Sequence, residues 1–221
     1  MARSLRWLAL AGGLAPLLFQ VVLVIEESLQ RRFLLSIGFD PLKSSFPSAN
    51  ALGPLGWMQT LNFILLGVLV IGFAYALHQG IRGGSAAGPI CISIVGACTI
   101  VAGLFPTDLP VSSPPHTFHG LVHALAFIIA SLGTLVGYVL LGLRFRSDYF
   151  WRGYDFFSFA TALVSVLAFL GANLVKGVVI AYAFAGMRVI WFSVVGLRLW
   201  SASAPIGGTP ERPLEEPLAD L

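Results

Sequence analysis

The stretch from Gly103 to Phe127, GLFPTDLPVSSPPHTFHGLVHALAF, concentrates the residues that could carry chemistry. It holds the acid Asp108 and three of the chain's four histidines, His116, His119 and His123. Imidazole and carboxylate groups can transfer protons, bind a polar ligand or coordinate a metal ion. Nearly all of the surrounding residues are apolar, so these four side chains need an explanation.

The three histidines are predicted to share one face of a helix. Ser113 is suited to cap this helix and Pro114 to occupy its first position, where a missing N–H costs nothing. Successive helical residues turn by about 100°, which places His116, His119 and His123 within an arc of about 100°. His119 and His123 are four residues apart, the spacing at which two imidazoles can bind one metal ion.

Asp108 lies in the preceding loop, between Pro106 and Pro110. There it could orient an imidazole or complete a coordination shell. Asp108, His119 and His123 therefore form a candidate metal-binding set, and zinc is the cofactor that such a set implies, although a tetrahedral site still needs a water molecule or a further ligand. Two other interpretations stay open. The residues could relay protons or bind a ligand, or they could have a structural role in which they bond loop carbonyls and cap a turn.

Arg188 is the second unusual residue, because it follows a run of apolar and small residues and precedes VIWFSVVGL. A charge at such a depth costs at least about 2.5 kcal/mol on insertion scales, and it normally faces the bundle interior with a partner. Asp108 is the acid expected on the same side of the membrane. An ion pair between Asp108 and Arg188 is the favoured interpretation, and binding of an anionic lipid or substrate headgroup is the alternative.

The composition identifies the class of protein that must position these residues. Hydrophobic residues make up 57% of the chain and charged residues 10%, with a mean hydropathy of +0.88. Soluble domains carry about 25% charged residues. The sequence therefore predicts an all-α polytopic transmembrane bundle whose partner is the lipid bilayer, and it leaves the oligomeric state open. The net charge of +3 indicates basic loops beside the membrane rather than binding of nucleic acid.

Six apolar segments are long enough to cross a bilayer, since about 20 helical residues cover about 30 Å. Their approximate bounds are Leu5–Ile25, Gly56–Leu77, Gly88–Phe105, Phe118–Leu143, Tyr154–Leu174 and Ala181–Trp200. The first resembles a signal peptide but is longer than usual and lacks a small-x-small cleavage site after it, so we expect it to be retained. Residues 1–200 are predicted to form one transmembrane domain, and residues 201–221, rich in Pro and Glu, a disordered cytoplasmic tail.

The distribution of basic residues predicts the orientation. With the N-terminus inside, the inner segments hold eight arginines and the outer segments four lysines and arginines. This excess places both termini in the cytoplasm of a protein expected in the plasma membrane. The Asp108 stretch and the long polar connection over residues 26–55 then lie on the extracytoplasmic side.

Other polar and sulfur-containing residues are expected to be architectural. Cys91 and Cys98 lie about 10 Å apart along one helix, too far for a disulfide. A further set of side chains in or near the spans is expected to form hydrogen bonds between helices. These are Gln20, Gln59, Asn62 and Asn173.

Four segments between Ser44 and Leu199 carry a family pattern. They are SSFPSANALGPLGWMQTLNFILLGVLVIGFAYAL, GLFPTD, HGLVHALAF and GMRVIWFSVVGLRL, in this order. The pattern resembles the DUF998 family of uncharacterised multi-pass membrane proteins, and by this resemblance its motif positions here are Phe105, Pro106, Asp108, His123 and Arg188. Family members often have Ser-Glu-Leu-Gly in the first loop, where this chain has no acid. The resemblance implies a multi-pass fold and no particular activity.

The sequence thus predicts an integral membrane protein with Asp108, His119, His123 and Arg188 in a polar cluster at its extracytoplasmic face. This cluster would bind a lipid headgroup or small ligand, or relay protons. The alternative is a metal-dependent membrane hydrolase acting on a lipid, with a weaker resemblance to the alkaline ceramidase and adiponectin-receptor group. Those enzymes bind zinc through residues on several spans, whereas the histidines here sit on one predicted helix. Whether the protein is an enzyme stays open.

Overall fold

A computed structural model of the chain describes residues 3–43, 46–110, 114–175 and 178–202, with side chains throughout except at residues 3, 169, 172–175, 178–181 and 202. The regular elements in these ranges are all helical, which confirms the predicted fold class. They are α1 (Arg3–Leu29), α2 (Arg31–Ser36), the 3₁₀ helix η1 (Pro47–Leu52), α3 (Gly56–Gly80), α4 (Ala87–Leu104), α5 (Phe118–Phe145), the 3₁₀ helix η2 (Tyr149–Trp151), α6 (Tyr154–Val175) and α7 (Val178–Ala202).

The six long helices coincide with the six predicted apolar segments. Within the described residues, α1, α3, α4, α5 and α7 are long and apolar enough to cross a membrane, and α6 contributes a shorter apolar helix, Tyr154–Ala168. Large apolar side chains also cover the outside of the bundle, including Val24, Leu132 and Leu163. An apolar outer surface suits lipid as its solvent, because a helix that is hydrophobic all round is either buried or membrane-spanning.

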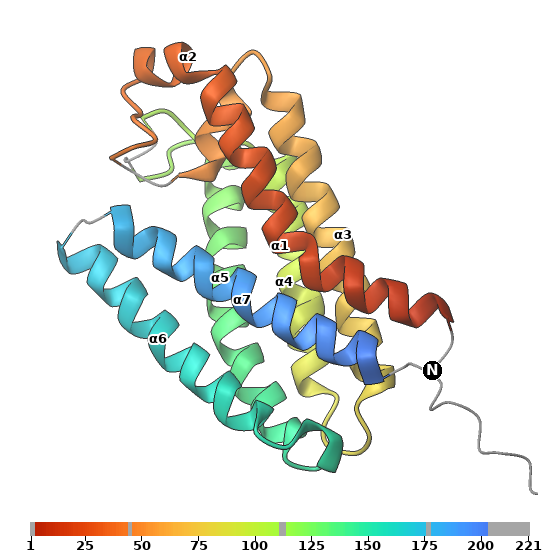
Figure 1. Cartoon of the computed structure of the whole chain (residues 1–221). Helices are drawn as coiled ribbons and strands as arrows, with labels where there is room; N and C mark the ends of the chain where they lie inside the picture. Colours follow the sequence, from red (N-terminus) through yellow and green to blue (C-terminus); the bar gives the residue numbers. More distant parts are fainter. Residues whose placement is uncertain (1–2, 44–45, 111–113, 176–177, 203–221) are drawn as a thin grey trace, which may run out of the picture.

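The long helices pack side by side in the order α1, α3, α4, α5, α6 and α7, and α7 packs back against α1 (Figure 1). At the top of Figure 1, the end of α1, α2, η1, the start of α3 and the α4–α5 connection lie together. We call this part the Asp108 end. The opposite end, which carries the α3–α4 and α5–α6 connections, is the Arg144 end.

Aromatic side chains from three helices fill the middle of the bundle. Tyr138 of α5 lies 4.6 Å from Trp191 of α7 between ring centroids, and Phe73 of α3 lies 5.2 Å from Phe192. All four side chains are fully buried. The indole N–H of Trp191 donates a hydrogen bond of 2.9 Å to the hydroxyl of Ser158 on α6, so four helices are joined at this level.

Glycines allow α1 and α7 to approach closely, as small residues do in membrane bundles. A Cβ added to Gly13 would lie 2.8 Å from the Cα of Gly196, and one added to Gly196 would lie 2.7 Å from the Cα of Gly13. The hydroxyl of Ser193 donates a 3.4 Å hydrogen bond to the carbonyl of Gly13 at the same crossing. Backbone therefore packs directly on backbone here.

Two of the four polar residues predicted to join helices do so. The amide of Asn62 on α3 donates to the carbonyl of Phe19 on α1 and to the side chain of Gln59, each at 3.1 Å. Gln59 donates to the carbonyl of Pro47 at 3.1 Å and so ties α3 to η1. Gln20 makes no side-chain hydrogen bond with the described residues, and the side chain of Asn173 lies outside them.

The buried guanidinium of Arg144 ties the end of α5 to the end of α3 and the α3–α4 connection. Arg144, near the end of α5, donates to the carbonyls of His78 at 3.0 Å, Ile81 at 2.9 Å and Ser85 at 3.0 Å. These carbonyls belong to the last turn of α3 and the connection that follows it. The last carbonyls of a helix lack partners within the helix, and Arg144 supplies donors for them.

Candidate functional site

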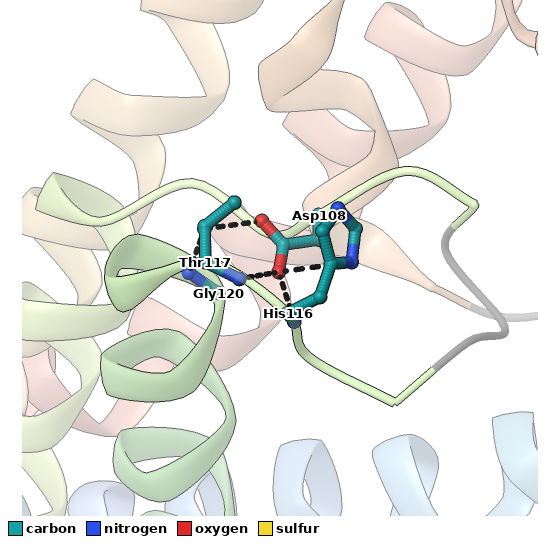
Figure 2. Close-up of polar contacts among 4 residues, drawn as sticks. All are labelled: Asp108, His116, Thr117 and Gly120. Atoms are coloured by element: carbon teal, nitrogen blue, oxygen red, sulfur yellow. Dashed lines mark hydrogen bonds and ion pairs between the residues drawn. The ribbon is translucent and has the colours of Figure 1, made fainter.

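Asp108 organises the start of α5. Its Oδ2 accepts hydrogen bonds from the backbone N–H of His116 at 2.8 Å and of Thr117 at 2.9 Å (Figure 2). Its Oδ1 accepts one from the Thr117 hydroxyl at 2.5 Å. The Thr117 hydroxyl oxygen in turn accepts from the backbone N–H of Gly120 at 3.1 Å. Because the first N–H groups of a helix have no partner within it, the Thr117 hydroxyl caps α5, and the Asp108 carboxylate holds the two residues that precede the helix.

The glycine at position 120 is required for this arrangement. A Cβ at Gly120 would collide with the carboxylate of Asp108. Its lack of a side chain lets the loop acid rest against the first turn of α5. The side chain of Asp108 is 10% exposed as a result.

The hydrogen bonds also fix the charge of Asp108. The Thr117 hydroxyl, then the N–H groups of Thr117 and His116, lower the pKa of Asp108 from 3.8 to about 2. Donors aimed at a carboxylate favour its ionised form, and the positive end of the α5 dipole acts in the same direction. Asp108 is therefore a fixed anion at neutral pH.

The sequence prediction of the helix start is corrected by this cap. Thr117, in extended conformation, is the N-cap and α5 begins at Phe118. Pro114 lies in the loop before the helix rather than at its first position, and the proposed cap Ser113 falls outside the described residues. His116 is consequently a loop residue, 59% exposed in its side chain, with its Nδ1 3.6 Å from Asp108 Oδ2. The predicted three-histidine helical face is reduced to His119 and His123.

His123 joins α5 to the end of α4. Its Nδ1 lies 2.9 Å from the carbonyl oxygens of both Ala102 and Phe105, and the residue is 7% exposed. Carbonyls only accept hydrogen bonds, so the partners assign the proton to Nδ1. In the neutral ring Nε2 then carries the lone pair. The residue supplies a donor to carbonyls that the end of α4 would otherwise leave unpaired.

His119 lies one turn before His123 and is exposed. Its ring packs near Phe105, at 5.6 Å between centroids, and near Phe118, at 6.1 Å. The three rings form a small aromatic cluster on the surface of the Asp108 end. His119 is thus the histidine of the helical pair that a ligand can reach.

The predicted zinc ligands do not fit a metal site as they are arranged. In the described ranges, no group of three or more His, Cys, Asp or Glu side chains gathers to hold a metal ion. The Asp108 carboxylate is occupied by three donors, and the Nδ1 of His123 is occupied by two carbonyls. The metal-dependent hydrolase stays a prediction that this geometry does not support.

Arg188 lies far from Asp108, and the expected ion pair between them is not formed. Arg188 interacts electrostatically with Tyr138 on α5, whereas Asp108 rests against Gly120 at the start of the same helix. At 1.5 Å per residue these two positions are about 27 Å apart along α5. The sequence predicts an Asp108–Arg188 pair only from the side of the membrane on which both residues are expected. That side does not determine how deep the Arg188 side chain lies.

Several buried polar atoms on α5, α6 and α7 lack a hydrogen-bond partner. They include the Nε of Arg188 itself, the hydroxyl of Tyr138 on α5 and the hydroxyl of Ser165 on α6. Ser165 lies two turns beyond Ser158, whose hydroxyl meets Trp191 on α7, so it lies on the same face of α6. Tyr138 and Ser165 are fully buried, while Arg188 is partly exposed.

Sequence reasoning missed Tyr138, Ser165 and also Glu26. Glu26 is fully buried near the end of α1, and both of its carboxylate oxygens lack a partner. In the sequence it closes an apolar run, where an acid is typical of a loop. Glu26 lies seven residues after Phe19 and three after Leu23, both of which are buried. This spacing puts the three residues on one helix face and could have placed Glu26 inside the bundle.

The fold and these buried polar groups define a polytopic helical membrane protein with an arginine inside its spanning region. The chain belongs to the DUF998 family, described as a protein of unknown function, whose model matches residues 13–202. No curated protein and no solved structure matches the chain. The resemblance inferred from the sequence motifs is thereby confirmed.

Proposed function

We propose that this membrane protein binds the anionic headgroup of a membrane amphiphile at Arg188. One observation carries the proposal: the guanidinium lies within a membrane-spanning helix, and its buried Nε has no hydrogen-bond partner. Arginine keeps its charge under all ordinary conditions. A charge in this position is costly and normally has a partner.

The described part of the protein supplies no such partner. The ion pairs formed there are Lys43 with Asp40, His116 with Asp108 and Arg146 with Asp155. None of them includes Arg188. A bound anion would therefore provide the countercharge that the described residues do not.

Two buried hydroxyls on α5 and α6 favour a ligand with several hydrogen-bond acceptors. Tyr138 and Ser165 each bring a buried hydroxyl that has no partner, and each can donate one hydrogen bond. With Arg188 they offer donors from α5, α6 and α7. A phosphate or carboxylate group can accept from all three, because charge-assisted hydrogen bonds to arginine tolerate several donors around one anion.

The partial exposure of Arg188 favours an amphiphile as the ligand. Part of this residue is exposed, in a helix that is long and apolar enough to cross a membrane. A headgroup can approach from the bilayer while its acyl chains stay in the hydrocarbon.

In this proposal the protein sits in the plasma membrane with both termini cytoplasmic, as the arginine distribution favours. Asp108 and His123 fix the α4–α5 corner, and His119 is the exposed polar contact there.

The experiment compares thermal unfolding of the purified protein in nanodiscs of phosphatidylcholine alone and of phosphatidylcholine with phosphatidylglycerol. We expect phosphatidylglycerol to raise the Tm of the wild type. In Arg188→Gln, the rise in Tm should be much smaller. The matched control is Arg146→Gln, an exposed arginine paired with Asp155. The control should keep the effect. Equal Tm gains in the wild type and in Arg188→Gln would refute the proposal.

Two further arms make the result specific. Tyr138→Phe removes one hydroxyl and should weaken the stabilisation by phosphatidylglycerol without unfolding the protein, which covers the case in which Arg188→Gln does not fold. Glycerol 3-phosphate added to phosphatidylcholine nanodiscs tests a soluble anion. If it raises the Tm as much as phosphatidylglycerol does, the ligand is a small anion rather than an amphiphile.

A further inference from the structure

Glu26 is a buried acid that the proposed headgroup site does not use. It lies in the last turn of α1 and is 0% exposed. Oε1 and Oε2 are both buried, and neither has a hydrogen-bond partner. An ionised carboxylate in such a place would cost many kcal/mol, and a group in this situation gives up its charge instead.

The donors near Glu26 are already committed to other acceptors. Directly after the end of α1, the amide of Gln30 donates to the carbonyl of Asn50 at 3.2 Å, and its oxygen accepts from the N–H of Leu55 at 3.0 Å. On α3, the amide of Asn62 donates to Phe19 and Gln59. The side-chain oxygen of Asn50 is itself buried without a donor. Acceptors therefore exceed donors around the end of α1.

In the part of the chain that the structure describes, no charged or titratable group forms an ion pair with Glu26. On α1 the neighbouring group is Glu27, whose negative charge opposes that of Glu26. Arg31 and Arg32 of α2 are exposed, while η1 and the first half of α3 carry no ionisable side chain. On α7 the groups are Tyr182, whose hydroxyl donates to the carbonyl of Pro41 at 3.2 Å, and Arg188. Neither of them bonds or pairs with Glu26.

We propose that Glu26 is a proton-binding site, with its side chain held as a neutral carboxylic acid inside the bundle. The bound proton removes the charge and supplies the O–H donor that the end of α1 lacks. When water reaches the carboxyl, the acid can release this proton and later take it up again. This site rests on α1 and its neighbours, and it stands whether or not Arg188 binds a headgroup.

The test treats the full chain in liposomes with dicyclohexylcarbodiimide, an apolar reagent that reacts with protonated carboxyl groups. The carboxyl oxygen bonds to the central carbon of the carbodiimide and the acid proton moves to a nitrogen. The O-acylisourea then rearranges to an N-acylurea without loss of atoms. Peptide mass spectrometry locates the added mass.

We expect the label on Glu26, with less of it as the pH is raised. Glu26→Gln should lose this label, and the matched control Glu27→Gln should keep it at position 26. The infrared carbonyl band of protonated carboxyl groups should also be weaker in Glu26→Gln than in the wild type, and this readout does not depend on access of the reagent. A protein that shows neither the label nor this band at any pH at which it stays folded would overturn the proposal. Protection of Glu26 by Na⁺ or K⁺ at constant pH would also overturn it, because the site would then hold a metal cation.

Discussion

The Thr117 hydroxyl donates a hydrogen bond to Oδ1 of Asp108 at 2.5 Å and accepts one from the N–H of Gly120 at 3.1 Å. One small side chain thus connects a loop acid to the first turn of α5. The two most conspicuous polar groups of this corner, Asp108 and His123, both bond backbone atoms of the α4–α5 connection or its flanking turns. Their geometry explains a defined loop conformation, whereas Arg188 and Glu26 are charged residues with buried side-chain atoms that have no hydrogen-bond partner.

Replacement of Thr117 by alanine should weaken the start of α5. Loss of an N-cap side chain costs about 1 kcal/mol, and here the loop acid loses a donor as well. Thr117→Ser keeps the hydroxyl and should retain most of the stability. His116→Ala is the control, because it keeps the backbone hydrogen bond to Asp108 and removes only the exposed ring, whose Nδ1 lies 3.6 Å from Asp108 Oδ2. Reversible unfolding in mild detergent measures all three, and an alanine variant as stable as the serine variant would show that the cap contributes little.

The contribution of Asp108 should depend on pH. Its pKa is lowered from 3.8 to about 2 by the Thr117 hydroxyl and by two backbone N–H groups. A lowered pKa in the folded state means that the stabilisation is complete above pH 3.8 and is lost as the pH falls through about 2. The Tm difference between wild type and Asp108→Asn should therefore be constant near neutral pH and shrink between about pH 4 and pH 2. A difference that stays constant to pH 2 would assign the effect of the substitution to shape rather than to charge.

Replacement of His123 should separate its two ring nitrogens. Nδ1 donates to the carbonyls of Ala102 and Phe105, and the amide nitrogen of asparagine occupies a similar position. His123→Asn should thus retain more stability than His123→Gln, whose amide extends toward the position of Nε2. Leaving buried carbonyls unpaired costs about 1–3 kcal/mol. If instead His123→Gln is the more stable variant, the bonds to the end of α4 are not what position 123 contributes.

The helical class and the approximate helix bounds could be predicted from the sequence, because long apolar runs leave a membrane helix as nearly the only arrangement that satisfies the backbone. The cap of α5 could not. Ser113 and Pro114 fit the local preference for a helix start, but Asp108 pairs with N–H groups eight and nine residues away, at His116 and Thr117. Local propensity contains no information on such a contact.

The partner of Arg188 was predicted wrongly for a related reason. The distribution of basic residues predicts the side of the membrane on which a residue lies. The depth of the residue and the direction of its side chain depend on which helices are its neighbours. Arg188 faces Tyr138 because α7 crosses α5 near the aromatic centre of the bundle. Glu26 was missed because an acid that ends an apolar run is assigned to a loop, whereas α1 continues to Leu29 and keeps this side chain inside.

The crossing of α1 and α7 should tolerate no side chain on its glycines. A Cβ at Gly196 would lie 2.7 Å from the Cα of Gly13 and 2.9 Å from the carbonyl oxygen of Ala9, both of which are backbone atoms. Since backbone cannot rotate away, Gly196→Ala should force the helices apart and cost about 1–3 kcal/mol, as overpacking does elsewhere. Gly186→Ala is the matched control on the same helix, because a Cβ there meets nothing within 4 Å. It should be neutral or should stabilise α7 by up to about 1 kcal/mol through helix propensity. Unfolding of both variants in the same detergent gives the comparison. If Gly196→Ala proves as stable as Gly186→Ala, α1 and α7 do not approach each other through these glycines.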